Sequence, residues 1–408
     1  MMKALVLTGG SGREMLPLSK YCPKTMLLLH GKHVIEYVLD GLIETGVEEF
    51  IVVTGHQGEK LHVLIEAYRS RGVNIQTVNQ GNLQGIEGAI LSAATHFGKD
   101  KPFLLAYGDI VAPPKFYHHL LNSYINTAAD GAISVTLIGK SQEFGIANID
   151  DRGFIKTISP DPSTGDNDTN YIFAGASILP GEFFEILSEE VKLTKALARV
   201  LKEQRRICAS VWQDEWIDVG YGWDLLAANQ DIFKGLDYAR IHKSAKISPS
   251  AHISGLALIE EGVTIDHNAE IVGPCFIGKN VYIGTNSLIR EFSCIGMNSN
   301  IGYSVEVKNS VIQSNVKIGR LSFVGDSILG ENVTIGSGVT TMNVLRDDEM
   351  HESTQEIKGR KYHKLGAIIG PNSVIGSNSV IKPYVIIDAD QVIPDGTVIK
   401  ANIPKKDS

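Results

Sequence analysis

The sequence has few cysteines, no long apolar run and no cluster of basic residues, and each shortage excludes a class of protein. Only 4 cysteines occur in 408 residues, without the spacing of a metal site or a disulfide scaffold. We therefore expect reduced thiols in a cytoplasmic protein. No run of about twenty apolar residues is present, and residues 4–7 are too short for the apolar core of a signal peptide. We expect no membrane partner.

The charge balance argues against binding to a nucleic acid. Lys and Arg number 38 against 46 Asp and Glu, which gives a formal net charge of -8. Because no stretch rich in Lys and Arg interrupts this balance, we expect no nucleic-acid partner. The hydrophobic fraction of 43% is ordinary for a globular protein, and the length predicts two domains.

The first half of the chain alternates short apolar runs with amphipathic stretches, which predicts an α/β domain over residues 1–237. The expected strands are 3–7, 49–54, 74–78, 102–107 and 132–137, and the expected helices are 33–45, 59–69, 88–96, 114–124 and 223–233. This order predicts a Rossmann-like domain with a mostly parallel sheet. Ligands of such sheets bind at the carboxyl ends of the strands.

A glycine-rich loop follows the first predicted strand. Gly9, Gly10 and Gly12 permit φ > 0 and bring backbone N–H groups close to a ligand, while Arg13 and Lys24 add positive charge. These features indicate a phosphate site, although the glycine spacing alone is equally compatible with an ordinary tight turn. The loop fits neither Gly-x4-Gly-Lys-Ser/Thr nor Gly-x-Gly-x-x-Gly.

The longer pattern around this loop resembles the signature of the sugar-1-phosphate nucleotidylyltransferases. The matching residues are Leu7-x-x-Gly-x-Gly12, then Pro17-Leu18-Ser19 and Pro23-Lys24. The resemblance implies that Lys24 and the glycines bind a nucleoside triphosphate. Where the family has Thr-Arg, this chain has Arg13-Glu14. Arg13 is the candidate to replace the family's arginine, and the Glu14 carboxylate would repel the triphosphate.

Two aspartates are candidate ligands of a metal ion. Asp109 follows Tyr107-Gly108 at the end of a predicted strand, and Asp218 lies in Trp216-Ile-Asp-Val-Gly. Mg²⁺ commonly takes one or two carboxylates together with phosphate oxygens. The resemblance implies that both aspartates hold Mg²⁺. The alternatives are a simple turn at Asp109 and an N-cap role for Asp218 in a helix that begins near Tyr221.

Four further residues match the family's binding segments. The resemblance implies that Gln80 and Gly85 bind the nucleotide base, and that Gly145 and Gly175 line the sugar pocket. Glu87 departs from the pattern because it adds an anionic side chain, and the family's Glu-Lys-Pro motif is absent. The departures affect residues that handle phosphate and sugar.

The second half of the chain, residues 238–408, repeats an apolar residue at every sixth position. The repeat includes Ile247, Ile253, Ile259, Ile265, Ile271, Ile277, Ile283, Ile289, Ile295, Ile301 and Val307. Neither a helix nor a simple strand has this period, and a fixed short repeat predicts a β-solenoid. The recurrent Ile-Gly dipeptides resemble the hexapeptide motif of left-handed parallel β-helices. That resemblance implies a homotrimer or a dimer of trimers.

Residues 340–366 interrupt the repeat with a long polar loop. Asn343, Arg360, His363 and Lys364 belong to segments that resemble those of archaeal bifunctional enzymes, which join a nucleotidylyltransferase to an amino-sugar acetyltransferase. The resemblance implies acetyl-CoA as a co-substrate, with His363 as a candidate general base. An ordinary exposed loop histidine is the alternative.

Three functional hypotheses follow. The first is a Mg²⁺-dependent enzyme that makes a nucleotide sugar and pyrophosphate from a nucleoside triphosphate and a sugar 1-phosphate. The second is a regulatory subunit that binds a nucleotide or nucleotide sugar without turnover, which Glu14 and Glu87 favour. The third is an acyltransferase whose only activity resides in the solenoid.

Overall fold

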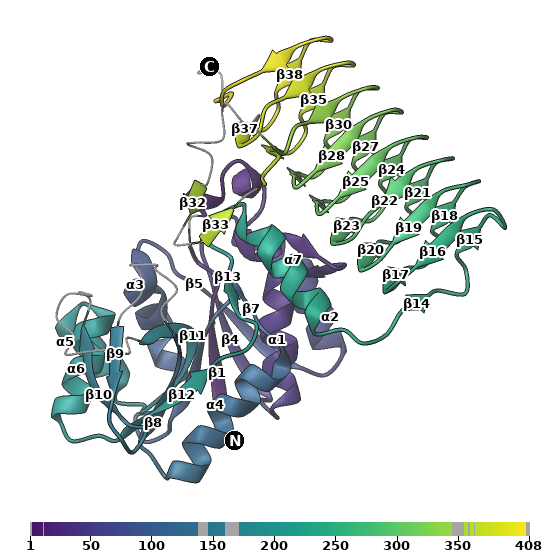
Figure 1. The fold of residues 1–408 in the computed structure, drawn as a ribbon. Coiled ribbons are helices and arrows are strands. Elements are labelled where there is room, and N and C mark those ends of the chain that lie inside the picture. The colour runs from purple at the N-terminus through teal and green to yellow at the C-terminus, as the bar shows by residue number, and fades with distance from the viewer. Residues whose placement is uncertain are drawn as a thin grey trace. The chain divides into compact units, whose positions relative to one another are not determined.

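The computed structural model describes residues 2–10, 12–137, 146–159, 171–344, 355–357, 360–362 and 364–404 (Figure 1). The chain forms two compact units. The first comprises Met1–Ser11, Val34–Asp218 and Lys358–Arg360, and the second comprises Gly12–His33, Val219–Ile357 and Lys361–Ser408. The sequence boundary between residues 237 and 238 stays a prediction.

The first unit is built on a mixed sheet whose central strands are parallel. β1 (Lys3–Leu7) lies between β4 (Glu49–Thr54) and β6 (Phe103–Tyr107), and β5 (Asn74–Asn79) flanks β4. β1, β4 and β6 are largely apolar because they are buried as inner strands of a parallel sheet, whereas β5, at the edge, is mostly exposed. The predicted mostly parallel α/β domain is confirmed.

The remaining strands extend this sheet beyond β6. β11 is antiparallel to β6, β8 and β9, and β12 is parallel to β8. The strands are β8 (Gly131–Leu137), β9 (Ile146–Ile149), β10 (Ile155–Ser159), β11 (Tyr171–Leu179) and β12 (Ile207–Trp212). A separate pair is formed by β7 (Ile110–Val111) and β13 (Ile217–Asp218).

Helices cover both faces of the sheet, since alternate strand residues point to opposite sides. One core joins Leu5, Ile51 and Phe103 to residues of α3, α5 and α6. On the other face α1 and α4 contact each other. The helices of this unit are α1 (Val34–Glu44), η4 (Gly58–Leu61), α2 (His62–Ser70), α3 (Gly85–Ser92), η5 (Ala94–His96), α4 (Pro114–Thr127), α5 (Phe183–Glu190) and α6 (Leu193–Lys202). No described helix has the length and apolar character needed to cross a bilayer.

The second unit is dominated by a parallel β-helix with three faces, each an eight-stranded parallel sheet. Figure 1 shows the coils stacked in chain order, from teal to yellow. The first face comprises β14 (Arg240–Ile241), β17 (Ala257–Ile259), β20 (Cys275–Ile277), β23 (Ser293–Ile295), β26 (Val311–Ile312), β29 (Ile328–Leu329), β34 (Ala367–Ile369) and β37 (Val385–Ile387).

The other two faces repeat this arrangement. The second face comprises β15 (Lys246–Ile247), β18 (Thr264–Ile265), β21 (Tyr282–Ile283), β24 (Asn300–Ile301), β27 (Lys317–Ile318), β30 (Thr334–Ile335), β35 (Val374–Ile375) and β38 (Val392–Ile393). The third face comprises β16 (His252–Ser254), β19 (Glu270–Val272), β22 (Leu288–Ile289), β25 (Glu306–Lys308), β28 (Phe323–Gly325), β31 (Thr340–Thr341), β36 (Val380–Ile381) and β39 (Val398–Ile399).

The six-residue period of the sequence is the spacing from one face to the next. The recurrent isoleucines and valines form a single buried core along the inside of the β-helix. Asparagine is frequent at the corners, where residues such as Asn280, Asn298 and Asn315 adopt positive φ. Asn tolerates this conformation better than most residues do. The predicted β-solenoid is confirmed.

The two shortened repeats lie at the same corner of the β-helix. The steps from Val307 to Ile312 and from Val324 to Leu329 both lead from the third face to the first. One coil later, the same corner leads from β31 to β34 and carries the interruption, which begins after Thr341. Two short strands in that interruption, β32 (Gln355–Ile357) and β33 (Arg360–Tyr362), pair with each other.

The first face is covered by residues that do not belong to the coils. Its outward-facing residues Leu258, Phe276, Cys294, Val311 and Ile328 are all buried. The covering elements come from the 12–33 segment and from the stretch after Asp218. They are η1 (Arg13–Met15), η2 (Leu18–Lys20), η3 (Lys24–Met26), β2 (Leu28–Leu29), β3 (Lys32–His33) and α7 (Asp224–Lys234). The 12–33 segment is therefore packed as part of the second unit.

Candidate functional site

The carboxyl ends of three parallel strands bring the predicted loops of the first unit together. Leu7 is the register partner of both Val53 and Tyr107. Beyond the strands, Thr8 N–H donates to Val53 O at 2.9 Å and Gly108 N–H donates to Leu7 O at 2.9 Å. Gly9 and Asp109 consequently follow neighbouring strands at one edge of the sheet.

Gln80 lies against the glycine loop. A Cβ atom at Gly9 would overlap Gln80 Oε1, so only glycine permits this approach. The Gln80 Nε2 group donates to Leu83 O at 2.8 Å and to Gly85 O at 2.9 Å. Its two N–H groups thus shape the 81–85 loop, and Oε1 is the end directed at Gly9. No described heavy atom lies within 4 Å of a Cβ placed on Gly10.

Asp109 and Asp218 are brought together by the short pair of β7 and β13. Asp218 is the register partner of Ile110, which directly follows Asp109. The interpretation of Asp218 as an N-cap is wrong. The following helix, α7, begins at Asp224, and Asp224 Oδ2 accepts from the N–H groups of Gly220 at 3.0 Å and Tyr221 at 2.7 Å.

Negative charge accumulates around these two aspartates. Burial raises the pKa of Tyr107, and the carboxylates of Asp109, Glu87 and Asp218 raise this pKa further. Burial likewise raises the pKa of Tyr117, with an added effect from Asp109. A divalent cation would reduce the repulsion between the neighbouring carboxylates. Two carboxylates are a donor set that suits Mg²⁺ when phosphate oxygens complete its coordination. The described residues contain no cluster of three or more metal-binding side chains.

Glu87, the second anionic departure from the family pattern, accepts a hydrogen bond from the backbone of Leu193. Its Oε1 accepts from Leu193 N–H at 3.2 Å, where α6 begins. A carboxylate at the N-terminus of a helix is stabilised by the orphan N–H groups and the helix dipole. The structure therefore gives Glu87 a role in fixing α6.

Gly175 marks the point where β11 meets β7. Its φ is +82°, and a Cβ there would lie 2.7 Å from Ile110 Cγ1. The register of β11 against β8 shifts between Phe173 and Ser177, which places this kink beside β7. Of the two predicted sugar-pocket glycines, Gly145 lies outside the described residues.

The residues Gly12, Arg13 and Lys24 belong to the second unit. Gly12 has a φ of +63°, and its carbonyl accepts from Ser19 Oγ at 2.6 Å. Arg13 and Glu14 are exposed in η1, while Lys24 is half-buried at the start of η3.

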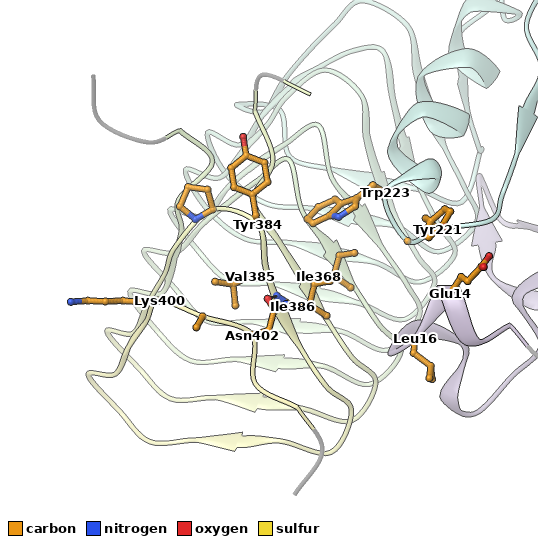
Figure 2. A pocket seen from close by; sticks show the side chains of 13 residues that line it. Glu14, Leu16, Tyr221, Trp223, Ile368, Tyr384, Val385, Ile386, Lys400 and Asn402 are labelled. Carbon is orange, nitrogen blue, oxygen red and sulfur yellow. Dashed lines mark hydrogen bonds between the residues drawn. The ribbon is translucent and has the colours of Figure 1, made fainter. Parts of the chain in front are cut away.

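A cavity of about 610 Å³ lies beside Glu14 in the second unit (Figure 2). Glu14 and Leu16 form one side of it, and Lys400 and Tyr384 of the last coils form another. Glu14, one of the two anionic departures from the family pattern, thus lines a cavity together with residues of the β-helix.

Asp326 contacts the candidate residue Asn343, and the sequence analysis missed it. It is 4% exposed, and its Oδ2 accepts from Asn343 Nδ2 at 2.5 Å while its Oδ1 accepts from Asn309 Nδ2 at 2.6 Å. The available signal was an aspartate at a corner position where most other corners carry Asn. Lys364 is exposed. Arg360 lies in β33, and His363 lies outside the described residues.

Comparison with family models assigns both halves of the chain. Residues 3–235 match the model described as nucleotidyl transferase. Residues 271–353 match the model described as the GMPPB C-terminal domain.

Two archaeal proteins are similar over nearly the whole length. The bifunctional protein GlmU of Methanococcus maripaludis is 31% identical over 412 residues, which cover 95% of this chain and 95% of that protein. The bifunctional sugar-1-phosphate nucleotidylyltransferase/acetyltransferase of Sulfurisphaera tokodaii is 30% identical over 414 residues, which cover 98% of each chain.

A solved structure shares the fold of part of the chain. The crystal structure of UDP-glucose pyrophosphorylase complexed with UDP-glucose superposes with a TM-score of 0.50 at 24% identity, covering 58% of this chain and all of that one. This superposition shows the fold alone. The family model over residues 3–235 and the archaeal relatives establish that the chain belongs to the nucleotidyl transferase family and carries a C-terminal parallel β-helix domain.

Proposed function

We propose that this protein is a Mg²⁺-dependent sugar-1-phosphate nucleotidylyltransferase. The observation that carries the proposal is the pairing of β7 with β13, which sets Asp109 beside Asp218 at the carboxyl edge of the parallel sheet. Family membership and the relatives named as nucleotidylyltransferases support it.

In the proposed reaction a phosphate oxygen of the sugar 1-phosphate attacks the α-phosphorus of a nucleoside triphosphate. The new P–O bond forms as the bond from the α-phosphorus to the bridging oxygen breaks, and that electron pair leaves with pyrophosphate. No covalent intermediate with the protein is needed. Catalysis then depends on positioning and on neutralising charge.

Each residue has a proposed task. Asp109 and Asp218 hold the Mg²⁺ ion, which would supply charge neutralisation at the phosphates. Arg13 and Lys24 hold the triphosphate with the backbone of Gly9, Gly10 and Gly12.

Gln80 and Gly85 form the base pocket, and Gly145 and Gly175 border the sugar. Because the Gln80 N–H groups are engaged by Leu83 and Gly85, its Oε1 is the atom available to read a base. That atom favours a base with an N–H donor at its pairing edge.

The test is pyrophosphate release from the purified protein with Mg²⁺. UTP, dTTP, GTP, CTP and ATP are each crossed with glucose 1-phosphate, mannose 1-phosphate and N-acetylglucosamine 1-phosphate. Release with one combination well above the rest supports the proposal and names the substrates. Nucleotide binding without any release would favour the alternative of a regulatory subunit.

A second activity, amino-sugar acetyl transfer from acetyl-CoA, is favoured by the contact between Asn343 and Asp326. Because Asn343 Nδ2 donates to the Asp326 carboxylate, Asn343 Oδ1 is fixed as the acceptor end of the amide. An acceptor there suits the amino group of an amino sugar. In this proposal Arg360 and Lys364 bind phosphate groups and His363 is the general base.

The acetyl-transfer test follows thiol release from acetyl-CoA with glucosamine 1-phosphate. Asn343→Asp should abolish release, whereas Asn332→Asp, in an exposed corner whose Nδ2 donates to Asn372 Oδ1, should not. Equal rates in both variants would remove Asn343 from the site.

The assembly and location of the protein are also proposals. A β-helix of this kind is expected to form a homotrimer or a dimer of trimers, which light scattering coupled to size-exclusion chromatography would measure. All four cysteines are free thiols, which suits the proposed cytoplasmic location.

A further inference from the structure

The 12–33 segment carries two proposed triphosphate ligands, Arg13 and Lys24, yet it packs as part of the β-helix unit. Its polar contacts with residues of the coils are concentrated on either side of Lys24. These contacts involve residues that no part of the nucleotidyl transferase reaction described above uses.

The first contact is a reciprocal hydrogen-bonded pair between Gln313 and Leu28. Leu28 N–H donates to Gln313 Oε1 at 2.9 Å, and Gln313 Nε2 donates to Leu28 O at 2.9 Å. Gln313 directly follows β26 and is 4% exposed. Because a buried backbone N–H or C=O is costly to leave unpaired, this side chain fixes the position of Leu28 strongly.

The second contact lies on the other side of Lys24. Asp390 Oδ2 accepts from Lys20 Nζ at 2.5 Å and also accepts from Tyr21 Oη. Asn372 Nδ2 donates to Asp390 Oδ1 at 3.1 Å, which holds the carboxylate on the corner of its coil. The side chains of Lys20 and Asp390 are partly exposed, so we expect this contact to be weaker than the one between Gln313 and Leu28.

A third contact anchors the end of the segment. His30 N–H donates to Cys294 Sγ at 3.3 Å, and the His30 ring stacks on Phe276 at 5.4 Å between centroids. Gly31 has a φ of +74°, and a Cβ there would lie 3.0 Å from Phe276 Cζ. A side chain at this position would be strained and would crowd Phe276, so the path favours glycine.

Contacts with the coils therefore lie on both sides of Lys24 in the sequence, at residues 20–21 and at residue 28. Between these contacts Thr25 is 2% exposed, so the short η3 helix is packed rather than solvated. The beginning of the segment differs, because Glu14 and Leu16 border the 610 Å³ cavity (Figure 2). The anchoring acts on Lys24 far more than on Arg13.

We propose that the β-helix positions Lys24 for triphosphate binding, and that Gln313 and Asp390 are the positioning residues. This inference rests on the proposed function, because it assumes that Lys24 contacts the triphosphate. It gives the β-helix a part in nucleotide transfer that is separate from assembly and from acetyl transfer.

The test uses the full chain with Gln313→Leu, which keeps the apolar bulk and removes both hydrogen bonds to Leu28. Ser287→Ala is the matched control. Ser287 is 1% exposed and its Oγ donates to Gly302 O at 2.8 Å, so this variant also loses a buried hydrogen bond of the β-helix. It has no described contact with the 12–33 segment.

Two measurements are made on each variant. Hydrogen exchange of peptides that cover residues 20–31 reports the anchoring without any need for activity. Steady-state kinetics of pyrophosphate release report KM for the triphosphate and kcat separately.

For Gln313→Leu we expect exchange over residues 24–29 to rise about tenfold and KM for the triphosphate to rise about tenfold, with a smaller change in kcat. Asp390→Asn keeps an acceptor for Lys20 and Tyr21, so it should show a smaller effect in the same direction. Ser287→Ala should leave both readouts unchanged.

Unchanged exchange in Gln313→Leu would overturn the anchoring. Faster exchange with an unchanged KM would overturn the link to Lys24. Absence of pyrophosphate release in the unmodified protein would contradict the proposed function and, with it, the catalytic part of this inference. In that case the exchange measurement still decides whether Gln313 holds the segment.

Discussion

The proposed site residues are held in place in two different ways. Asp109 and Asp218 are held by backbone pairing within one sheet system, where Asp218 faces Ile110 across two short strands. The 12–33 segment that carries Lys24 is held by side chains of the β-helix that lie far away in the sequence, such as Gln313, which is 285 residues from its partner Leu28. Backbone pairing is tolerant of side-chain change, whereas anchoring through side chains depends on a few residues. Substitutions should therefore affect the two regions differently.

The largest effect is expected at the carboxylate pair. Asp218→Asn keeps the shape of the side chain and removes its charge, so we expect pyrophosphate release to fall about a thousandfold or more. The control is Asp214→Asn, which removes the same charge from an exposed pair with Lys115 at 2.8 Å. Turnover by Asp218→Asn close to that of the control would remove this carboxylate from the metal site.

A substitution at Gly175 tests whether the kink in β11 supports the pair. Gly175→Ala adds a Cβ at a φ of +82° and 2.7 Å from Ile110, so we expect turnover to fall and the free energy of unfolding to drop by about 1 to 3 kcal/mol. Gly153→Ala is matched in strain, since Gly153 has a φ of +83° with no described atom within 4 Å of its Cβ. Denaturant unfolding of both variants separates the clash from the strain, and equal losses would show that the contact with Ile110 is unimportant.

The anchored region should show a pH dependence that the carboxylate pair does not explain. Burial lowers the pKa of His30 to about 4, below its ordinary value of 6.5. The unfolded chain therefore binds a proton more readily than the folded chain does between these values. Stability from this group is present above pH 6.5 and is lost as the pH falls toward 4, by up to about 3 kcal/mol. Urea unfolding across this range should show the slope, and His30→Gln should remove most of it.

The smallest effect is expected at Asp390. Hydrogen bonds from Lys20 and Tyr21 lower the pKa of this carboxyl to about 2, so its contribution is present above its ordinary value near 3.8 and is lost as the pH falls toward 2. The partners are partly exposed, and we expect Asp390→Asn to cost less than about 1 kcal/mol, with the cost shrinking in high salt. A loss as large as that of Gln313→Leu would show that the order of the two anchors is reversed.

The sequence predicted the local features of the fold well. The apolar runs located β1, β4, β5, β6 and β8 to within a residue, and the six-residue period identified the β-helix. Both signals are local, since they depend on how neighbouring side chains alternate between buried and exposed. Asp109 and Asp218 were chosen because motifs name them, and the structure places them at the paired strands β7 and β13; their binding of a metal stays a prediction.

The covering of the first face was missed, although the sequence carries a signal for it. The residue before each buried isoleucine is apolar on this face, as at Leu258, Phe276 and Cys294, and is polar on much of the second face, as at Lys246 and Thr264. An apolar outward row predicts that something packs on it. The sequence gives no such signal for Gln313 and Asp390, which contact the 12–33 segment. Their contacts join residues 285 and 370 positions apart, and such contacts produce no repeating pattern in the sequence.

The most direct test of the central claim follows the α-phosphorus itself. A nucleoside triphosphate labelled at the α-phosphate is incubated with a sugar 1-phosphate and Mg²⁺, with the unmodified chain and with Asp218→Asn in parallel. Our account predicts that the label passes into a nucleotide sugar with the unmodified chain only, and only when Mg²⁺ is present. Recovery of all the label as bound, unchanged triphosphate would contradict it and would favour a protein that binds nucleotides without turnover.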